Sequence, residues 1–327
     1  MQSILSKINF ELGRNPKIIR SKNKNDFIPH GYSAVFILSA DFELAWAWRF
    51  SKYEKDPLKR AFKKAENARK NIPKILNLCD KYNIPITWAT VGHLFLEECS
   101  KKENIAHPEM PRLSYFENKY WKFIKGDWYD ADPCSNLTNN PLWYAPDIIK
   151  DIINRKVLHE IACHTFSHID CSDEICLKEV FDKEISKCIE LANKYNIKLK
   201  SFVHPGHTIG NLANLSKKGF TSFRTDYRNV LGYPKKHKTG LWEIKSTAEI
   251  CYNNYWSEKY HIYRYKKIIN RAIKYNKICY FWFHPSMDLC VADIILPNIF
   301  DHLAKNRDKI YITTTEKYIN YLNKKNV

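Results

Sequence analysis

The stretch "LHEIACHTFSHID", residues 158 to 170, holds three of the twelve histidines of the chain. His164 and His168 have the H-x-x-x-H spacing, which on a helical turn places both imidazoles on one face. Two histidines and a carboxylate are a common catalytic set for zinc or a similar divalent ion, with one position left for water. The stretch therefore predicts a metal centre that activates water for hydrolysis.

Further candidate groups stand where predicted strands end. Asp41 and Glu43 follow the apolar run 33–41, and their spacing places them on one face of an extended strand. His284 ends the strand-like segment "ICYFWFHP". Because parallel strands all point the same way, these side chains are expected to converge at one mouth. A second carboxylate can take a proton from metal-bound water and a separate histidine can protonate the leaving group.

Strand-like and helix-like segments alternate from residue 33 onward, which predicts βα units and a parallel sheet. Seven or eight such units indicate an α/β fold and suit a barrel better than an open sheet, although periodicity does not decide between the two. The predicted helices are 57–82, 93–103 and 174–195. The predicted strands are 33–41, 84–92, 158–164, 199–205, 222–226, 241–247, 278–285 and 309–314.

The remaining segments predict one domain, residues 31–327, behind a mobile basic leader, residues 1–30. Residues 105–146 are rich in Pro, Trp and Tyr and are predicted to form an insertion loop that acts as a lid or binding loop. Residues 227–240 are a basic excursion without clear regular structure. Neither an internal repeat nor a linker divides the domain, and nothing in the sequence indicates an oligomeric state.

Composition narrows the function classes. The formal charge is +18, but the lysines are scattered along the chain, which argues against a specific nucleic-acid partner and indicates only a diffuse attraction for anions. The ten cysteines form no C-x-x-C pair, which favours a reducing compartment. The amino terminus lacks the apolar core of a signal peptide, and no run reaches the roughly 18 apolar residues of a membrane span. We expect a cytoplasmic protein without a transmembrane segment.

The chain resembles the polysaccharide deacetylase (NodB-homology) family, of the carbohydrate esterase type, over residues 32 to 315. The motifs that carry the resemblance occur in family order: "SADFEL", "HEIACHTFSH", "SFVHPGH", "GFTSFR", "LWEI" and "FWFHP". The most specific is H-[ST]-x-x-H at 164–168. The resemblance implies an α/β fold, a distorted (β/α) barrel of about seven strands, and metal-dependent hydrolysis of a non-peptide carbon–nitrogen bond. The implied substrate is an N-acetylated sugar or sugar conjugate, in surface-polysaccharide biosynthesis.

The resemblance also implies roles for individual residues. His164 and His168 match the metal-binding histidines, and the first-motif carboxylates match one base and one ligand. We assign Asp41 as the base and Glu43 as the ligand, because Glu43 has the longer reach, although the reverse assignment is open. His284 matches the histidine that serves as general acid. The implied cofactor is one divalent metal, Zn²⁺ first, with Co²⁺, Ni²⁺, Mn²⁺ and Fe²⁺ as alternatives.

The third motif departs from the family pattern, which has an arginine next to the proline to orient the base. Here residues 203–207 read "VHPGH". His204 and His207 are candidates to replace that arginine or to bind substrate, and the alternative is that they serve only hydrogen bonding within the loop. Arg224 is a second candidate for contact with the carboxylates, and Asp226 is a candidate for tuning His284.

Aromatic rings near the motifs are candidates for packing on sugar faces. Trp46 and Trp48 follow the first motif, and Trp128 and Asp130 lie in the insertion, so all four are predicted to line the substrate site. His93 and His159 are interpreted as structural.

Two alternative functions fit the same sequence. One is a hydrolase of a linear amide or ureide that is not a sugar, on the same scaffold. The other is a carbohydrate-binding barrel whose catalysis is impaired by the missing arginine.

Overall fold

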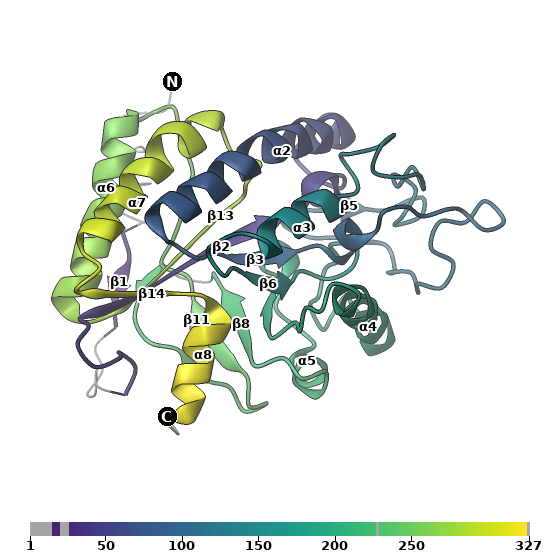
Figure 1. Ribbon diagram of the computed structural model, residues 1–327. Coiled ribbons are helices and arrows are strands. Elements are labelled where there is room, and N and C mark those ends of the chain that lie inside the picture. The colour runs from purple at the N-terminus through teal and green to yellow at the C-terminus, as the bar shows by residue number, and fades with distance from the viewer. Residues whose placement is uncertain (1–14, 20–25, 227–228, 326–327) are drawn as a thin grey trace.

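The computed structural model describes residues 15–19, 26–226 and 229–325. Its centre is a ten-stranded sheet that curls into a partial barrel, with helices along its outer side (Figure 1). The predicted α/β barrel class is thereby confirmed. All strand pairs in this sheet are parallel except β10 with β11. The strands are β2 (Ala34–Phe42), β3 (Thr87–Thr90), β6 (Glu160–Cys163), β7 (Ser201–Val203), β8 (Ser222–Thr225), β10 (Lys235–Lys236), β11 (Trp242–Lys245), β12 (Ala248–Glu249), β13 (Ile278–Phe283) and β14 (Ile310–Thr313).

The helices alternate with the strands along the chain. The α-helices are α2 (Pro57–Tyr82), α3 (Pro146–Ile153), α4 (Lys178–Asn193), α5 (Leu212–Lys217), α6 (Glu258–Tyr275), α7 (Leu296–Lys305) and α8 (Thr315–Lys324). Short 3₁₀ helices are η1 (Leu44–Trp46), η2 (Gly92–Phe95) and η3 (Pro205–His207), and η4 (Val291–Ile295) is a π-helical turn. Two small sheets pair β1 (Lys17–Ile18) with β9 (Val230–Leu231) and β4 (Phe116–Glu117) with β5 (Lys122–Phe123).

The central strand β2 is buried on both faces, as a covered parallel strand must be. Its outward side chains join the large core under the helices: Ala34, Phe36, Leu38, Ala40 and Phe42. Its inward side chains change character along the strand, from Val35 and Ile37 to Ser39 and Asp41. The barrel interior is therefore apolar at the amino end of β2 and polar at its carboxyl end.

Helix α8 packs against the apolar half of the interior (Figure 1). Thr314 caps its first turn by accepting a hydrogen bond from the backbone N–H of Lys317. Tyr318, Ile319 and Leu322 of α8 then join the same apolar cluster as Val35 and Ile37. With one end of the barrel filled in this way, the polar end is left for chemistry.

The structure corrects the predicted helix 93–103. Only Gly92–Phe95 is helical, as η2, and the chain then becomes extended. The backbone N–H of Cys99 donates to Ser135 O at 2.9 Å, and that of Leu137 donates to Glu97 O at 3.0 Å. Pairing with the insertion thus outweighs the local helix tendency.

The predicted leader falls mostly on residues 1–14 and 20–25, which lie outside the described residues. Within it, Lys17 and Ile18 form β1 and pair in parallel with β9. This short piece of the leader is therefore tied to the domain.

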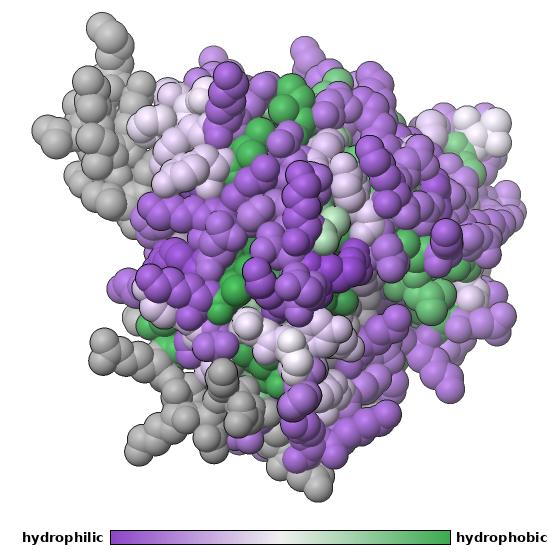
Figure 2. Space-filling view, turned by 60° about the vertical axis from the view of Figure 1, so that its left-hand side comes forward, coloured by the Kyte–Doolittle hydropathy of each residue, from purple (hydrophilic) through white to green (hydrophobic). Residues whose placement is uncertain are grey.

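The face seen in Figure 2 is largely hydrophilic, with apolar residues in small separate areas. Among the described residues, no helix combines the length and apolar character that crossing a bilayer requires.

Helix α2 begins at a side-chain cap that offers a stability test. Asp56 Oδ1 accepts a hydrogen bond from the backbone N–H of Lys59 at 2.9 Å, and Pro57 occupies the first turn. Asp56→Ala should lower the free energy of unfolding by about 1 kcal/mol. Asp56→Asn keeps an acceptor oxygen and should lose much less. Urea unfolding of the two variants measures the difference, and equal losses would contradict the cap.

Candidate active site

The predicted metal ligands and His284 meet at the carboxyl ends of the strands. Glu43 follows β2, His164 follows β6, and His284 follows β13. One oxygen of Glu43, Oε1, lies 3.1 Å from His164 Nε2 and 3.1 Å from His168 Nε2. His284 Nε2 lies 3.7 Å from the other oxygen, Oε2. The structure thus brings one carboxylate and three imidazoles together, all from strand ends.

The two histidines do not lie on a helical turn, contrary to the prediction from their spacing. The backbone is left-handed at Thr165, with φ 58°, and at His168, with φ 59°. The buried carboxylate of Glu184 in α4 holds this loop. It accepts hydrogen bonds from the backbone N–H of Ser167 at 2.8 Å and from the Ser167 hydroxyl at 2.7 Å. The loop, rather than a helix, therefore aims both imidazoles at Glu43.

The donor set fits a cation. His164 Nδ1 lies 2.7 Å from Val203 O, and a carbonyl oxygen can only accept, so Nδ1 carries the proton. In the neutral imidazole Nε2 is then a bare lone pair, and it points at an oxygen of Glu43. Burial raises the pKa of Glu43, but the imidazoles of His284, His164 and His168 outweigh burial and lower it well below its ordinary value. These three side chains could hold one divalent metal with two nitrogens and one oxygen.

Asp41 is paired with Arg224 inside the barrel. The guanidinium donates from Nη1 to Asp41 Oδ1 at 2.7 Å and from Nη2 to Oδ2 at 2.6 Å, and Nη1 also donates to Ser39 Oγ at 2.8 Å. Trp282 lies under the guanidinium, 4.6 Å from its centre. Burial raises the pKa of Asp41, but the charge and hydrogen bonds of Arg224 outweigh burial and lower it. Asp41 is therefore an ionised carboxylate held in a fixed orientation.

His284 stands at the rim with its side chain 23% exposed. Its Nδ1 lies 3.7 Å from Glu249 Oε1. Burial lowers the pKa of His284, but Glu43 and Glu249 outweigh burial and raise it to about 9. The following turn is fixed by Asn71 of α2, whose amide donates to Pro285 O at 2.9 Å. His284 is thus a positioned cation at neutral pH.

The contacts of Asp226 are with Ser246 and His207 rather than with His284, which it was predicted to tune. Asp226 accepts a hydrogen bond from Ser246 Oγ, and its Oδ2 lies 3.6 Å from His207 Nε2. His204 Nε2 lies 3.2 Å from Gly210 O, the hydrogen-bond partner of that ring. His204 and His207 both line the pocket above the site, but Arg224, rather than either histidine, binds Asp41.

The site opens into a pocket of about 500 Å³ whose walls are partly aromatic. Tyr53, Tyr120, Trp48, Trp121 and Trp282 line it together with the polar groups described above. The insertion supplies Tyr120 and Trp121, so it forms part of the pocket wall.

The predicted substrate contacts of Trp46, Trp128 and Asp130 are not found at this pocket. Trp46 is fully buried and Trp128 is 2% exposed, and their rings enclose the guanidinium of Arg49 at 4.7 and 4.6 Å. Asp130 closes a turn by accepting from the backbone N–H of Asp127. Their aromatic or acidic character therefore serves the insertion's own packing.

Trp48, predicted with Trp46 as a ring near the first motif, lines the pocket, and so does Trp121, which was not predicted as a site residue. One signal for Trp121 is Gly206 in "HPGH", which has a φ of 55°. A Cβ at that position would lie 2.7 Å from a ring carbon of Trp121. The glycine thus allows the insertion to approach the site.

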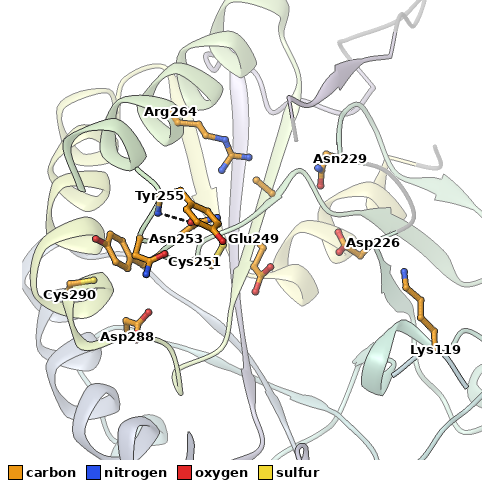
Figure 3. Close-up of a pocket in the computed structure, with 13 residues that line it drawn as sticks. Lys119, Asp226, Asn229, Glu249, Cys251, Asn253, Tyr255, Arg264, Asp288 and Cys290 are labelled. Atoms are coloured by element: carbon orange, nitrogen blue, oxygen red, sulfur yellow. Dashed lines mark hydrogen bonds between the residues drawn. The ribbon is translucent and has the colours of Figure 1, made fainter. Parts of the chain in front are cut away.

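A larger cavity of about 1200 Å³ adjoins this pocket, and Asp226 and Glu249 line both. Figure 3 shows Lys119 and Asp226 on one side of the cavity and Asp288 and Cys290 on the other, with Glu249 between them. The site is therefore one end of a longer hollow.

The Asp41–Arg224 pair gives a direct test of the buried charges. Arg224→Met leaves a carboxylate buried without its partner, and the free energy of unfolding should fall by about 3–5 kcal/mol. Removing the charge as well, in Asp41→Asn/Arg224→Met, should recover most of that loss. Urea unfolding of both variants measures the coupling, and a double variant no more stable than the single one would refute it.

No family model and no curated protein sequence matches the chain. Solved structures do match its fold. A protein from Mycobacterium smegmatis assigned as a polysaccharide deacetylase superposes with a TM-score of 0.61 at 12% identity, over 96% of each chain. One from Pseudomonas aeruginosa PAO1, also assigned as a polysaccharide deacetylase, gives 0.61 at 12% identity over 91% of this chain and 94% of its own. Puue allantoinase gives 0.60 at 12% identity over 92% and 94%. The chain therefore has the fold that the sequence motifs predicted, that of the polysaccharide deacetylases.

Proposed function

We propose that the protein is a metal-dependent deacetylase that hydrolyses the acetamido group of an N-acetylated sugar or sugar conjugate. The observation that carries the proposal is the shared Glu43 oxygen between two histidine nitrogens, beside an ionised carboxylate and a cationic histidine. Ligands, base and acid of a hydrolysis then stand within one pocket.

Glu43, His164 and His168 would hold the metal, with zinc the first expectation. When bound, a divalent ion lowers the pKa of a coordinated water to about 7 and polarises a carbonyl oxygen. The assignment of Glu43 as the ligand and Asp41 as the base is supported by their partners. Glu43 faces the imidazoles, whereas both oxygens of Asp41 are engaged by Arg224.

Asp41 takes the proton of the attacking water. Arg224 orients the carboxylate and keeps it ionised, which is the role that the family resemblance gives to the third-motif arginine. Here the arginine comes from β8 instead. Because Arg224 takes the place of the third-motif arginine, Asp41 can still act as a base. This argues against the alternative of a carbohydrate-binding barrel with impaired catalysis.

His284 gives its proton to the departing nitrogen. Glu43 and Glu249 keep the imidazole protonated, so the acid form is present before reaction. The water oxygen bonds to the acetyl carbon, the carbon–nitrogen bond breaks, and the nitrogen leaves as an amine with the His284 proton. Acetate is the second product.

The substrate is inferred from the walls of the hollow. Trp48, Trp121 and Trp282 offer flat rings of the kind that pack on sugar faces. The adjoining cavity leaves room for further sugar units of the substrate next to the acetylated one. All ten cysteines are unpaired, which supports a reducing, cytoplasmic location. We therefore place the reaction on a precursor in surface-polysaccharide biosynthesis.

Metal binding and acetate release test the proposal together. His164→Ala and His168→Ala should each lose one equivalent of metal relative to the wild type, measured by plasma mass spectrometry, and acetate release should fall by at least about 100-fold, because the metal supplies the nucleophile. His302→Ala removes a histidine outside the site and is the control. Turnover of linear amides or ureides without acetate release from N-acetylated sugars would favour the alternative hydrolase.

The pH dependence tests His284. Its pKa is raised, so the acid form is complete at neutral pH and is lost as pH rises through about 9. The turnover number should therefore fall on the alkaline side. A cation bound to Glu43 weakens the effect of its negative charge on His284. The midpoint of the alkaline decline should therefore lie at or below about 9. His284→Asn should have a residual rate without this decline, and a variant that keeps the same alkaline decline would exclude His284 as the acid.

A further inference from the structure

A second group of metal-binding side chains lies outside the proposed active site. We call it the insertion cluster, and it consists of His93, Cys99, His107 and Asp132. His93 belongs to η2 at the end of β3, and the others follow it in the connection and in the insertion. One ligand atom from each lies within 4.8 Å of all the others. His93, His107 and Asp132 are at most 5% exposed, and Cys99 is half-buried.

The distances in the cluster resemble the edges of a tetrahedron. Cys99 Sγ lies 3.7 Å from His93 Nε2, from His107 Nε2 and from Asp132 Oδ2. Zinc–ligand distances in proteins imply sulfur edges of about 3.5 Å and nitrogen–oxygen edges of about 3.3 Å. The nitrogen–oxygen edges to Asp132 are 3.0 and 2.7 Å, so they would lengthen slightly around an ion.

The tautomer of His93 points to a cation rather than to hydrogen bonding alone. His93 Nδ1 lies 3.2 Å from Trp143 O, which can only accept, so Nδ1 carries the proton. In the neutral ring Nε2 is then a bare lone pair, yet it faces Asp132 Oδ2 at 3.0 Å. Two buried acceptors at this distance repel unless a positive charge lies between them.

The surroundings of the cluster orient its ligands as outer partners of metal sites do. The second oxygen of Asp132, Oδ1, accepts from the backbone N–H of Cys134 at 2.9 Å, which leaves Oδ2 aimed at the cluster. The hydroxyl of Tyr144 lies 3.1 Å from Cys99 Sγ. The carboxylate of Glu109 lies 3.8 Å from His107 Nδ1, the nitrogen that faces away from the cluster.

We propose that the insertion cluster binds a second, structural zinc ion. Four protein ligands, one of them a thiolate, close the coordination sphere, as in structural rather than catalytic zinc sites. The ion would fasten the insertion to the end of β3. Because the insertion also supplies Tyr120 and Trp121 to the pocket wall, this zinc would hold the substrate wall in place without taking part in hydrolysis.

Cobalt substitution tests this site separately from the proposed active site. Thiolate bound to Co²⁺ gives a near-ultraviolet charge-transfer band, and the proposed active-site ligands contain no sulfur. Cobalt-loaded wild-type protein should show the band and bind about two equivalents of metal. Cys99→Ser should lose the band, and the His164→Ala/His168→Ala double variant should keep it. Cys290→Ser removes another half-buried thiol and should leave the spectrum unchanged.

Several outcomes would overturn the second site. The first is a wild-type protein that takes up cobalt but shows no thiolate band. This measurement needs no variant, so it does not depend on whether Cys99→Ser folds. Another is a band that survives Cys99→Ser. His107→Cys keeps four ligands and adds a thiolate, so it should strengthen the band about twofold, and an unchanged band would remove His107 from the site. A third is a purified protein that holds no metal and in which His93 is an imidazolium. The cluster would then be a buried ion pair between His93 and Asp132 and not a zinc site.

Discussion

The arrangement of the candidate active site depends on one electrostatic constraint: several nitrogen lone pairs approach a single buried carboxylate, that of Glu43. Glu43 Oε1 has two imidazole nitrogens at 3.1 Å, and one of these, on His164, has its proton committed to the opposite side of the ring. Buried acceptors that face one another are costly without a positive charge between them. The loop around Ser167 and its anchor Glu184 therefore hold the imidazoles where a cation could bind, because a neutral His164 opposes its lone pair to the carboxylate.

The barrel interior separates this charged end from an apolar end. Along β2 the inward positions change from Val35 and Ile37 to Ser39 and Asp41, and Arg224 reaches from β8 to the last two. A carboxylate inside a barrel needs a partner that is equally buried, and a planar guanidinium can engage both of its oxygens at once. Arg224 thus orients Asp41, the proposed base, from across the barrel.

Much of the fold follows from local sequence signals. The predicted helix 57–82 agrees with the observed bounds of α2, which starts at the cap formed by Asp56 and ends at Asn83 in the left-handed conformation. Convergence of the strand-end residues was also predicted, because the carboxyl ends of parallel strands lie at the same end of the barrel. The reason given for the histidine pair was wrong, because the left-handed backbone at Thr165 and His168 depends on contacts with α4 that a spacing pattern does not contain.

The insertion shows where prediction from the sequence ended. Aromatic character alone predicted Trp46 and Trp128 as site residues, but both pack around Arg49, whereas Trp121 reaches the pocket. Which face of an irregular segment meets the barrel is decided by contacts between residues far apart in the chain. His93, interpreted as structural from the sequence, lies opposite Asp132, which follows it by 39 positions. In a segment with so little regular structure, the proposed zinc ion would add a cross-link between residues far apart in the chain, beside the packing and hydrogen bonds of the insertion itself.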